Sequence, residues 1–317
     1  MLDVRPLAAP FGAVVRGLDL SRPLCQGSAQ DLMRAFYRHQ FLVIPEQELA
    51  HGDFDRFCSH FGTPKPHLLD HLRLPGHPDI LTLSNIFEDG KPIGIFEGAS
   101  FWHTDVAYDL HPNRATIAYS LEVPAVEPAL KVASLALAYE ALPRAMQDRL
   151  EGLWALHHYG NRADMDENSP YSAERLTDAQ KTKIHNVYQP LVTRHPVTGR
   201  KSLYAIAGSA FGIHGMPDDE ALELLDELVV HATKPEFVLE YGYRVGDVAA
   251  WDTLSTLHKA PLTKPAERVE ERRLLWRISV TGGSPLFPDA PDFVGRTPEE
   301  MPATVRANGL GTPLHAH

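Results

Sequence analysis

Apolar and polar positions alternate along this chain in short blocks that turn-forming residues separate. Apolar residues recurring every three to four positions predict amphipathic helices over 29–38, 52–61, 135–153 and 218–230. Short apolar runs predict buried strands over 41–44, 80–83, 115–121, 237–241, 248–251 and 274–281. The 26 Pro and 22 Gly residues supply many turns. The pattern therefore predicts a mainly β core with flanking helices.

Finer features of the same pattern give further expectations. The stripe Tyr139, Leu142, Met146 and Leu150 predicts a packed core face on the helix over 135–153. Asp218 or Asp219 is expected near the N-cap of the helix over 218–230. Residues 85–100 carry three glycines and predict a long loop.

Two segments depart from the alternating pattern. Residues 160–190 are polar and poor in aromatic residues, which predicts an insertion, either a lid over a site or a solvated excursion. The tail over 284–317 is Pro-rich, and we expect it to wrap the surface of its own chain or of a neighbouring subunit. No internal repeat occurs, so residues 1–317 are expected to form a single domain.

Composition narrows the possible functions. The formal net charge of −11 argues against a nucleic-acid partner, because phosphate binding needs a basic surface. No run of 18 apolar residues occurs, so no membrane span is expected. The N-terminal residues lack the pattern of a secretory signal. Only two cysteines, Cys25 and Cys58, are present, which fits a reducing cytoplasm.

The candidate chemistry begins with the tripeptide His-x-Asp, which occurs three times among 17 histidines. The copy at His51 opens a predicted helix, where Asp53 suits the helix N-terminus. The copy at His77 contains a proline and is expected in a loop. The third copy, within Phe101-Trp102-His103-Thr104-Asp105, is the one that a strand follows and that downstream residues can complete.

His103 and Asp105 are two residues apart, so a strand end could present both side chains to one metal ion. His258, which follows Trp251-Asp252 in the chain, could close the site. Two imidazoles and one carboxylate form the facial triad of non-haem Fe(II) oxygenases, which leaves positions for substrate and O2. An oxidative enzyme is the leading hypothesis.

Longer motifs carry a more specific signal than this triplet. They are FWHTDVAY, AYEALP, RHPVTGRKSLY, HATKPEF, GDVAAWDTLSTLHKA and RRLLWRISVTG. Together, over roughly residues 10–285, they resemble the taurine dioxygenase/TfdA-type (TauD/TfdA) family of Fe(II)- and 2-oxoglutarate-dependent dioxygenases. The resemblance implies a double-stranded β-helix, a cupin-like jelly roll, with Fe(II) as the metal and 2-oxoglutarate and O2 as co-substrates.

The resemblance also implies roles for individual residues. His103, Asp105 and His258 are expected to be the metal ligands, and the carboxylate argues against a halogenase. Arg273 is expected to bind the distal carboxylate of 2-oxoglutarate, and Arg277 the anionic group of the substrate. The two arginine roles could be partly exchanged, and salt bridges to Glu270 or Glu271 are the structural alternative.

Two further positions are implied for substrate binding, and two features depart from the family. His67 matches a substrate-binding histidine, with an ordinary loop histidine as the alternative, and Asp70 is expected to meet a substrate ammonium group. Leu130 replaces the family threonine that helps to bind 2-oxoglutarate. The longer loop over 86–100 is expected to reshape the pocket, so taurine is not the leading substrate.

The expected reaction is hydroxylation of a C–H bond in a small anionic organic acid, with release of succinate and CO2. Desaturation or oxidative rearrangement of an amino-acid-derived acid would use the same residues and stays open. A non-catalytic relative that binds a metal or an anion, and a Zn hydrolase, are the rivals from other classes. Because related proteins form dimers or tetramers, a homo-oligomer is expected.

Overall fold

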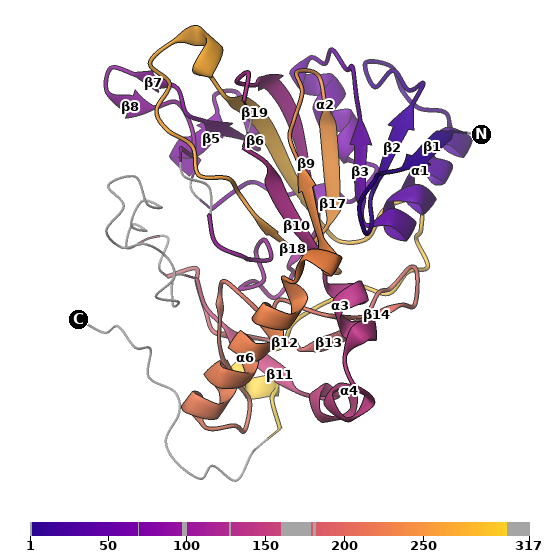
Figure 1. The fold of residues 1–317 in the computed structure, drawn as a ribbon, viewed down its shortest axis with the longest axis vertical. Coiled ribbons are helices and arrows are strands. Elements are labelled where there is room, and N and C mark those ends of the chain that lie inside the picture. The colour runs from indigo at the N-terminus through magenta and orange to yellow at the C-terminus, as the bar shows by residue number, and fades with distance from the viewer. Residues whose placement is uncertain are drawn as a thin grey trace.

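A nine-stranded sheet dominates the molecule (Figure 1). The computed structural model describes residues 2–68, 70–96, 100–126, 128–159, 179 and 182–302. Along the sheet the strand order is β1 (Asp3–Pro6), β2 (Ala13–Arg16), β3 (Phe41–Ile44), β17 (Val248–Asp252), β9 (Asn113–Glu122), β19 (Leu274–Thr281), β6 (His77–Ser84) and β5 (Arg73–Leu74). The short β4 (Thr63–Pro64) also pairs with β19.

A smaller sheet accompanies the large one, with the order β16 (Val238–Tyr241), β10 (Leu130–Ser134) and β18 (Thr256–Lys259). The chain passes repeatedly between the two sheets. It leaves β9 for β10, and later runs from β16 to β17, to β18 and to β19, changing sheet at each step. This alternation places strands that are distant in sequence next to each other.

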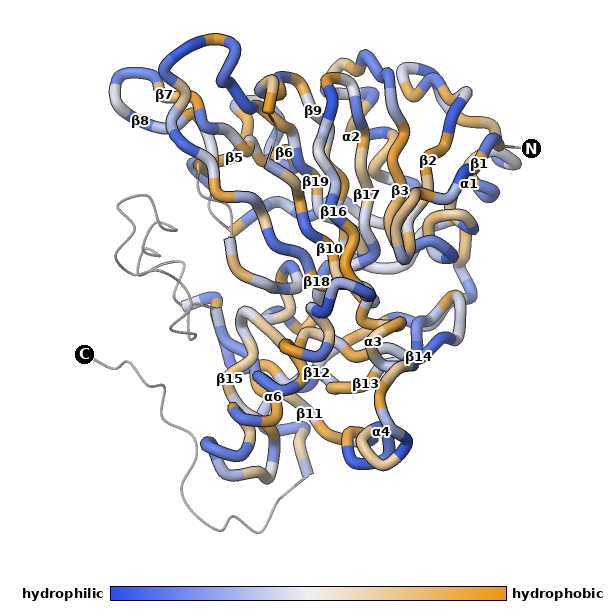
Figure 2. The backbone as a smooth tube through the Cα atoms, viewed as in Figure 1, coloured by the Kyte–Doolittle hydropathy of each residue, from blue (hydrophilic) through white to orange (hydrophobic). Residues whose placement is uncertain are grey.

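An apolar core fills the space between the two sheets. The small sheet contributes Leu130, Val132 and Leu239, and the large sheet contributes Phe41, Val43, Ala118, Ala249, Trp251 and Leu275. Hydrophobic positions gather on β3 and β10 in Figure 2. Strand β3 is buried along its whole length, which explains why its sequence is a continuous apolar run rather than an alternating one.

Two helices cover the other face of the large sheet. They are α1 (Gln26–His39) and α2 (His51–Cys58), close to the predicted ranges. Phe36 and Phe54 from these helices pack against Ile117 and Ile278 of the central strands. Because neighbouring residues of a strand point to opposite faces, β9 and β19 direct Thr116, Arg277 and Ser279 away from the helices.

Most of the remaining helices and two further strand groups form a second packed region, below the large sheet in Figure 1. Helices α3 (Leu135–Ala141), α4 (Arg144–Leu150) and α6 (Asp218–Ala232) lie beside the sheet β12 (Val187–Pro190), β11 (Trp154–His157) and β15 (Ala210–Ile213) and the hairpin β13 (Val192–Arg194) and β14 (Lys201–Leu203). The 3₁₀ turns are η1 (Asp70–Leu72), η2 (Pro235–Phe237), η3 (Val269–Glu271) and η4 (Pro298–Glu300).

The single helix predicted over 135–153 is wrong, because two helices, α3 and α4, occupy this range. Leu142 between them is extended, with a ψ of 143°, since a proline disfavours helical backbone at the residue before it and Pro143 follows. The predicted core stripe is confirmed, because Tyr139, Leu142 and Leu150 are buried in one cluster and Met146 packs against it.

Two local predictions also need correction. The loop over 85–100 contains a hairpin of β7 (Phe87–Glu88) and β8 (Lys91–Pro92), in which Asp89 and Gly90 both have positive φ, as a type I′ turn requires. The loop expected at His77 is the start of β6, where a proline is tolerated near the strand end. The acidic residues expected near the N-cap of α6 are confirmed, because Pro217 occupies the N-cap and Asp218 and Asp219 lie in the first turn.

The polar insertion predicted over 160–190 lies mostly outside the described residues, and its last four residues form β12. The described part of the tail, 284–302, packs against its own chain through contacts given below, and 303–317 lie outside the described residues. Among the described residues, no helix is both long and apolar enough to cross a membrane.

Candidate metal centre and substrate cavity

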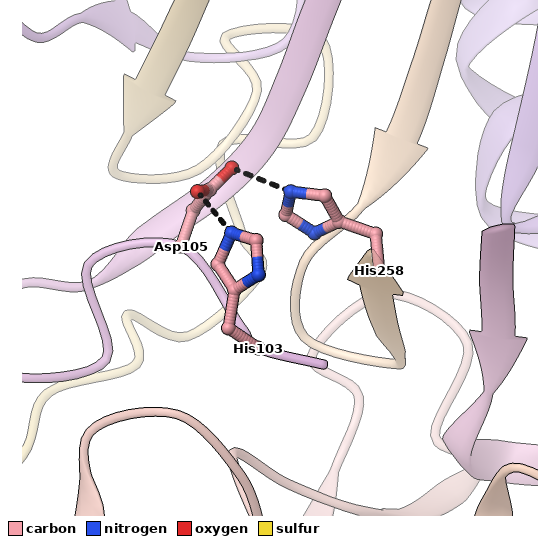
Figure 3. A group of neighbouring side chains, drawn as sticks. All are labelled: His103, Asp105 and His258. Carbon is pink, nitrogen blue, oxygen red and sulfur yellow. Dashed lines mark ion pairs between the residues drawn. The ribbon is translucent and has the colours of Figure 1, made fainter. Parts of the chain in front are cut away.

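A two-way backbone bridge brings His103 and His258 together. The His103 N–H donates to the His258 carbonyl at 3.0 Å, and the His258 N–H donates to the His103 carbonyl at 2.9 Å. This hydrogen-bonded pair places both side chains on the same face. The two imidazole centroids are 4.1 Å apart. A segment before β9 and the strand β18 thus supply the two histidines (Figure 3).

Asp105 supplies the carboxylate, although not from the strand end that the sequence predicted. It begins a turn over 105–108, and Val106 has a φ of +56°, a strained value for a β-branched residue. Asp105 Oδ1 lies 3.5 Å from His103 Nε2, and Oδ2 lies 3.7 Å from His258 Nε2 (Figure 3). A turn, rather than strand alternation, therefore produces the convergence.

Hydrogen bonding fixes the ring orientation of His103. Its Nδ1 lies 3.0 Å from the Phe101 carbonyl, which can only accept, so Nδ1 carries the proton and Nε2 presents a lone pair toward Asp105. Metal-binding histidines commonly hold their second nitrogen in this way. His258 is held by packing, because its ring lies 5.1 Å from that of Trp251.

Charge and burial set the protonation of the group. Burial is the largest single influence and would raise the pKa of Asp105, but the Arg277 guanidinium, together with His258 and His103, outweighs burial and holds the pKa well below its usual range. Burial, together with His103, holds the pKa of His258 well below that of a free imidazole. The site therefore presents an ionised carboxylate and a neutral imidazole near neutral pH.

These residues fit a divalent metal ion. One ligand atom from each of His103, Asp105 and His258 lies within 4.8 Å of the other two. Their side chains are between 6% and 14% exposed. Two imidazole nitrogens and one carboxylate oxygen would leave positions open to further ligands, as a facial triad requires. Among the described residues this is the only such group.

A cavity of about 800 Å³ adjoins the triad. Arg277 connects the two, because it lines the cavity and its Nη2 lies 2.8 Å from Asp105 Oδ1. Much of the wall is apolar. The apolar lining residues include Leu68, Leu81, Val106, Tyr108, Leu110, Ile184 and Pro298.

The substrate residues predicted from the sequence fall in different places. His67 lines the cavity with Arg277, and burial, then Arg277, lowers the pKa of His67 to about 4. Asp70 lies in the exposed turn η1 and is not among the described residues that line the cavity. Its role in substrate binding stays a prediction.

The two arginines are also separated. Arg277 lies within β19, whereas Arg273 precedes the strand and its guanidinium lies 5.9 Å from the centroid of the Tyr243 ring. Tyr243 belongs to the same intersheet cluster as Leu130, which is buried. Glu270 and Glu271 form ion pairs with Arg268. Arg277 therefore pairs with the candidate metal ligand rather than with those acids.

Comparison with known proteins identifies the family. Residues 3–279 match the family model described as taurine catabolism dioxygenase TauD, TfdA family. The chain belongs to the TauD/TfdA family. It is 30% identical over 279 residues to the alpha-ketoglutarate-dependent 2,4-dichlorophenoxyacetate dioxygenase of Cupriavidus pinatubonensis, covering 84% of this chain and 95% of the relative.

Two further TauD/TfdA comparisons agree. The alpha-ketoglutarate-dependent sulfate ester dioxygenase of Pseudomonas putida is 26% identical over 291 residues, covering 91% of this chain and 92% of the relative. The crystal structure of AAD-2 in complex with Mn(II) and N-oxalylglycine superposes with a TM-score of 0.73 and 27% identity, covering 90% of this chain and 98% of that one.

The predicted fold class is therefore confirmed: the two sheets form the jelly-roll core of a TauD/TfdA protein, with helices around it. The protein is a 2-oxoglutarate-dependent non-haem iron dioxygenase. It uses Fe(II), 2-oxoglutarate and O2, as the family does.

Several residues at the site were missed from the sequence. Thr116 and Ser279 are hydrogen-bonded to Asp105 and Arg277 respectively, and Thr297–Glu299 of the tail line the cavity. Ser279 could have been found, because it lies two residues from Arg277 on one strand. Thr116 and the tail could not, since their positions depend on strand register and on long-range packing.

Proposed function

We propose that this dioxygenase hydroxylates a C–H bond of a small organic anion that carries an apolar body, releasing succinate and CO2. The observation that carries the proposal is the placement of Arg277. Its side chain is 13% exposed, lines the cavity and leaves its Nε buried without a hydrogen-bond partner. A buried guanidinium with an unused donor is costly unless an anion meets it.

The cavity favours one anionic group beside a larger apolar part. Lys65, another cation of the wall, is already paired with Asp109 at 2.9 Å. A pKa of about 4 leaves His67 neutral near pH 7, so it could donate a hydrogen bond but not a second charge. Two relatives act on 2,4-dichlorophenoxyacetate and on sulfate esters, both anions with an organic body.

The proposed roles follow from this geometry. His103, Asp105 and His258 would hold Fe(II), and Arg273 would meet the distal carboxylate of 2-oxoglutarate. Bound iron with 2-oxoglutarate supplies the oxidising power. Arg277 would orient the anionic end of the substrate, and the apolar wall would exclude water and fix the C–H bond that reacts.

The first test concerns the cofactors. Fe(II) and then 2-oxoglutarate are added without oxygen to metal-free protein, and the visible metal-to-ligand charge-transfer band is recorded. The band should vanish in His103→Ala and weaken in Arg273→Ala. An iron-loaded wild type without a band, or an unchanged band in His103→Ala, would contradict these assignments.

The second test concerns the substrate. Carboxylates and sulfate esters with apolar bodies are screened for succinate release, each beside its neutral methyl ester or alcohol. The anion should be preferred, and Arg277→Leu should raise its KM by about 100-fold or more, because it removes a charge-assisted contact worth roughly 3 kcal/mol. Arg268→Leu, an exposed arginine, is the matched control. Equal turnover of the neutral analogues, or a product that has lost two hydrogens instead of gaining oxygen, would overturn the proposal.

A further inference from the structure

Four polar side chains form a closed ring of contacts behind the candidate metal ligands. Thr116 Oγ1 donates to Asp105 Oδ2 at 2.7 Å, and Arg277 Nη2 contacts Asp105 Oδ1 at 2.8 Å. Arg277 Nη2 also donates to Ser279 Oγ at 3.2 Å, and the Ser279 and Thr116 hydroxyls lie 3.3 Å apart. Each oxygen of Asp105 therefore has one partner in the ring in addition to the imidazole nearest to it.

The two charged members, Arg277 and Asp105, fix the direction of every hydrogen bond in this ring. A guanidinium can only donate, and an ionised carboxylate can only accept. Ser279 accepts from Arg277, so its own proton is available for Thr116. Thr116 accepts that proton and directs its own to Asp105. The donors thus run one way, from cation to anion, and such an aligned series strengthens each of its members.

Strand register builds the ring. Thr116 of β9 is the direct cross-strand partner of Ser279 of β19. Arg277 lies two residues from Ser279, on the same face of the same strand. The site side of these two adjacent strands therefore presents two hydroxyls and one cation at fixed spacing. The sheet itself holds them, whereas Asp105 comes from a turn that holds a strained backbone angle at Val106.

We propose that Thr116 and Ser279 are positioning residues that orient the Asp105 carboxylate and thereby set the affinity of the centre for its divalent metal. The proposal rests on Asp105 being a metal ligand, as proposed above. Without the Thr116 contact, Oδ2 would lose its hydrogen bond in the ring, and the carboxylate could rotate toward Arg277. Hydrogen-bond partners of metal ligands typically change affinity by about 10–100-fold when removed.

The test measures the binding of Mn(II) alone to metal-free protein by calorimetry and by loss of the free-ion electron paramagnetic resonance signal. Thr116→Val keeps the shape but removes the hydroxyl, and should weaken binding by about 10–100-fold. Thr116→Ser restores the hydroxyl and should bind within a few-fold of wild type. Ser279→Ala should give a smaller loss, because Thr116 can still donate to Asp105.

Thr82→Val is the matched control, because Thr82 is buried on the adjacent strand β6 and has no contact in the ring. Thermal unfolding of the metal-free proteins separates a folding defect from a positioning defect. Wild-type affinity in Thr116→Val, or an equal loss in Thr82→Val and Thr116→Val, would overturn the proposal. Mn(II) binding that survives His103→Ala would instead contradict the ligand assignment itself.

Discussion

At the scale of single residues, crowding around His103 holds the imidazole in place as much as hydrogen bonding does. Gly208 has a φ of +74°, and a Cβ added there would lie 2.8 Å from the His103 Cβ and 3.3 Å from its Cα. The glycine is therefore needed both for its backbone angle and for its lack of a side chain. His103 is confined between this backbone and the bridge to His258.

Gly208→Ala is expected to displace His103 and to weaken Mn(II) binding by at least about 10-fold, a change of roughly 1.4 kcal/mol. The measurement is calorimetric titration of the metal-free protein. Gly199→Ala is the matched control, because Gly199 has a φ of +68° but a Cβ there would meet no atom within 4 Å. An equal loss of Mn(II) affinity in the two variants would show that backbone strain, not contact with His103, causes the loss. Wild-type affinity in Gly208→Ala would contradict the prediction.

The residues of the triad could be predicted from the sequence, but their surroundings could not. The spacing of His103 and Asp105 and the downstream His258 point to a metal site without any structure. Nothing in the sequence indicates that Arg277 contacts Asp105 or that Thr116 faces Ser279, because these contacts depend on the register of β9 with β19. Local spacing is visible in a sequence, and register is not.

At the scale of elements, the tail from Ser284 to Pro302, called the strap below, contributes Thr297–Glu299 to the wall of the cavity. Phe287 packs against Tyr37 with ring centroids 5.6 Å apart, and Phe293 against Tyr204 at 4.8 Å. The Arg296 guanidinium lies 4.2 Å from the centroid of the Trp154 ring. These anchors hold Thr297–Glu299 in the cavity wall.

Gly295 packs closely against β12, next to Arg296, which pairs with Tyr188 of that strand through two backbone hydrogen bonds. A Cβ added there would lie 2.8 Å from the Val187 side chain and 3.0 Å from the Tyr188 carbonyl. Gly295→Ala is therefore expected to loosen the strap, raise the KM for the organic substrate several-fold and speed limited proteolysis within 284–302. Mn(II) affinity should not change, because the strap makes no contact with the triad among the described residues.

Gly283→Ala is the matched control. Gly283 immediately precedes the strap, and a Cβ added there would meet no atom within 4 Å. Proteolysis and KM that stay at wild-type values in Gly295→Ala would mean that the strap tolerates the displacement. A fall in Mn(II) affinity would mean that the strap and the metal centre are coupled.

Helices and strands were predicted well where the apolar pattern was uniform. They were predicted poorly where a proline or a turn-forming pair interrupted that pattern. The range of β19 follows from its apolar run alone, and β3 likewise. The helix over 135–153 failed at Pro143, and the loop over 85–100 failed at the Asp89-Gly90 turn. In both cases local backbone chemistry decided the outcome against the surrounding pattern.

At the scale of the whole molecule, folding buries the His157 imidazole in neutral form, and this links stability to pH. His157 of β11 is fully buried, its Nδ1 lies 3.0 Å from Ser209 Oγ, and its Nε2 has no hydrogen-bond partner. Burial lowers the pKa of His157 to about 3. The unfolded chain would bind a proton at this residue near pH 6.5, whereas the folded chain would not.

This difference in proton binding decides how the free energy of unfolding changes with pH. Above pH 6.5 neither state is protonated at His157, and its contribution to stability is complete. As the pH falls from 6.5 toward 3, the unfolded state binds more protons, so the free energy of unfolding falls. The slope for one such histidine approaches about 1.4 kcal/mol per pH unit.

His157→Gln keeps a side chain that can bond to Ser209 but removes the titrating group. In metal-free protein with a chelator present, denaturant unfolding between pH 6.5 and 4.5 should show a slope smaller than that of wild type, by a difference that rises to about 1.4 kcal/mol per pH unit at the acidic end. Above pH 7.5 the two proteins should run parallel, because His157 is neutral in both states there. Parallel curves over the acidic range as well would mean that the folded protein opens to protonate His157, so that burial of this imidazole adds nothing to its acid sensitivity.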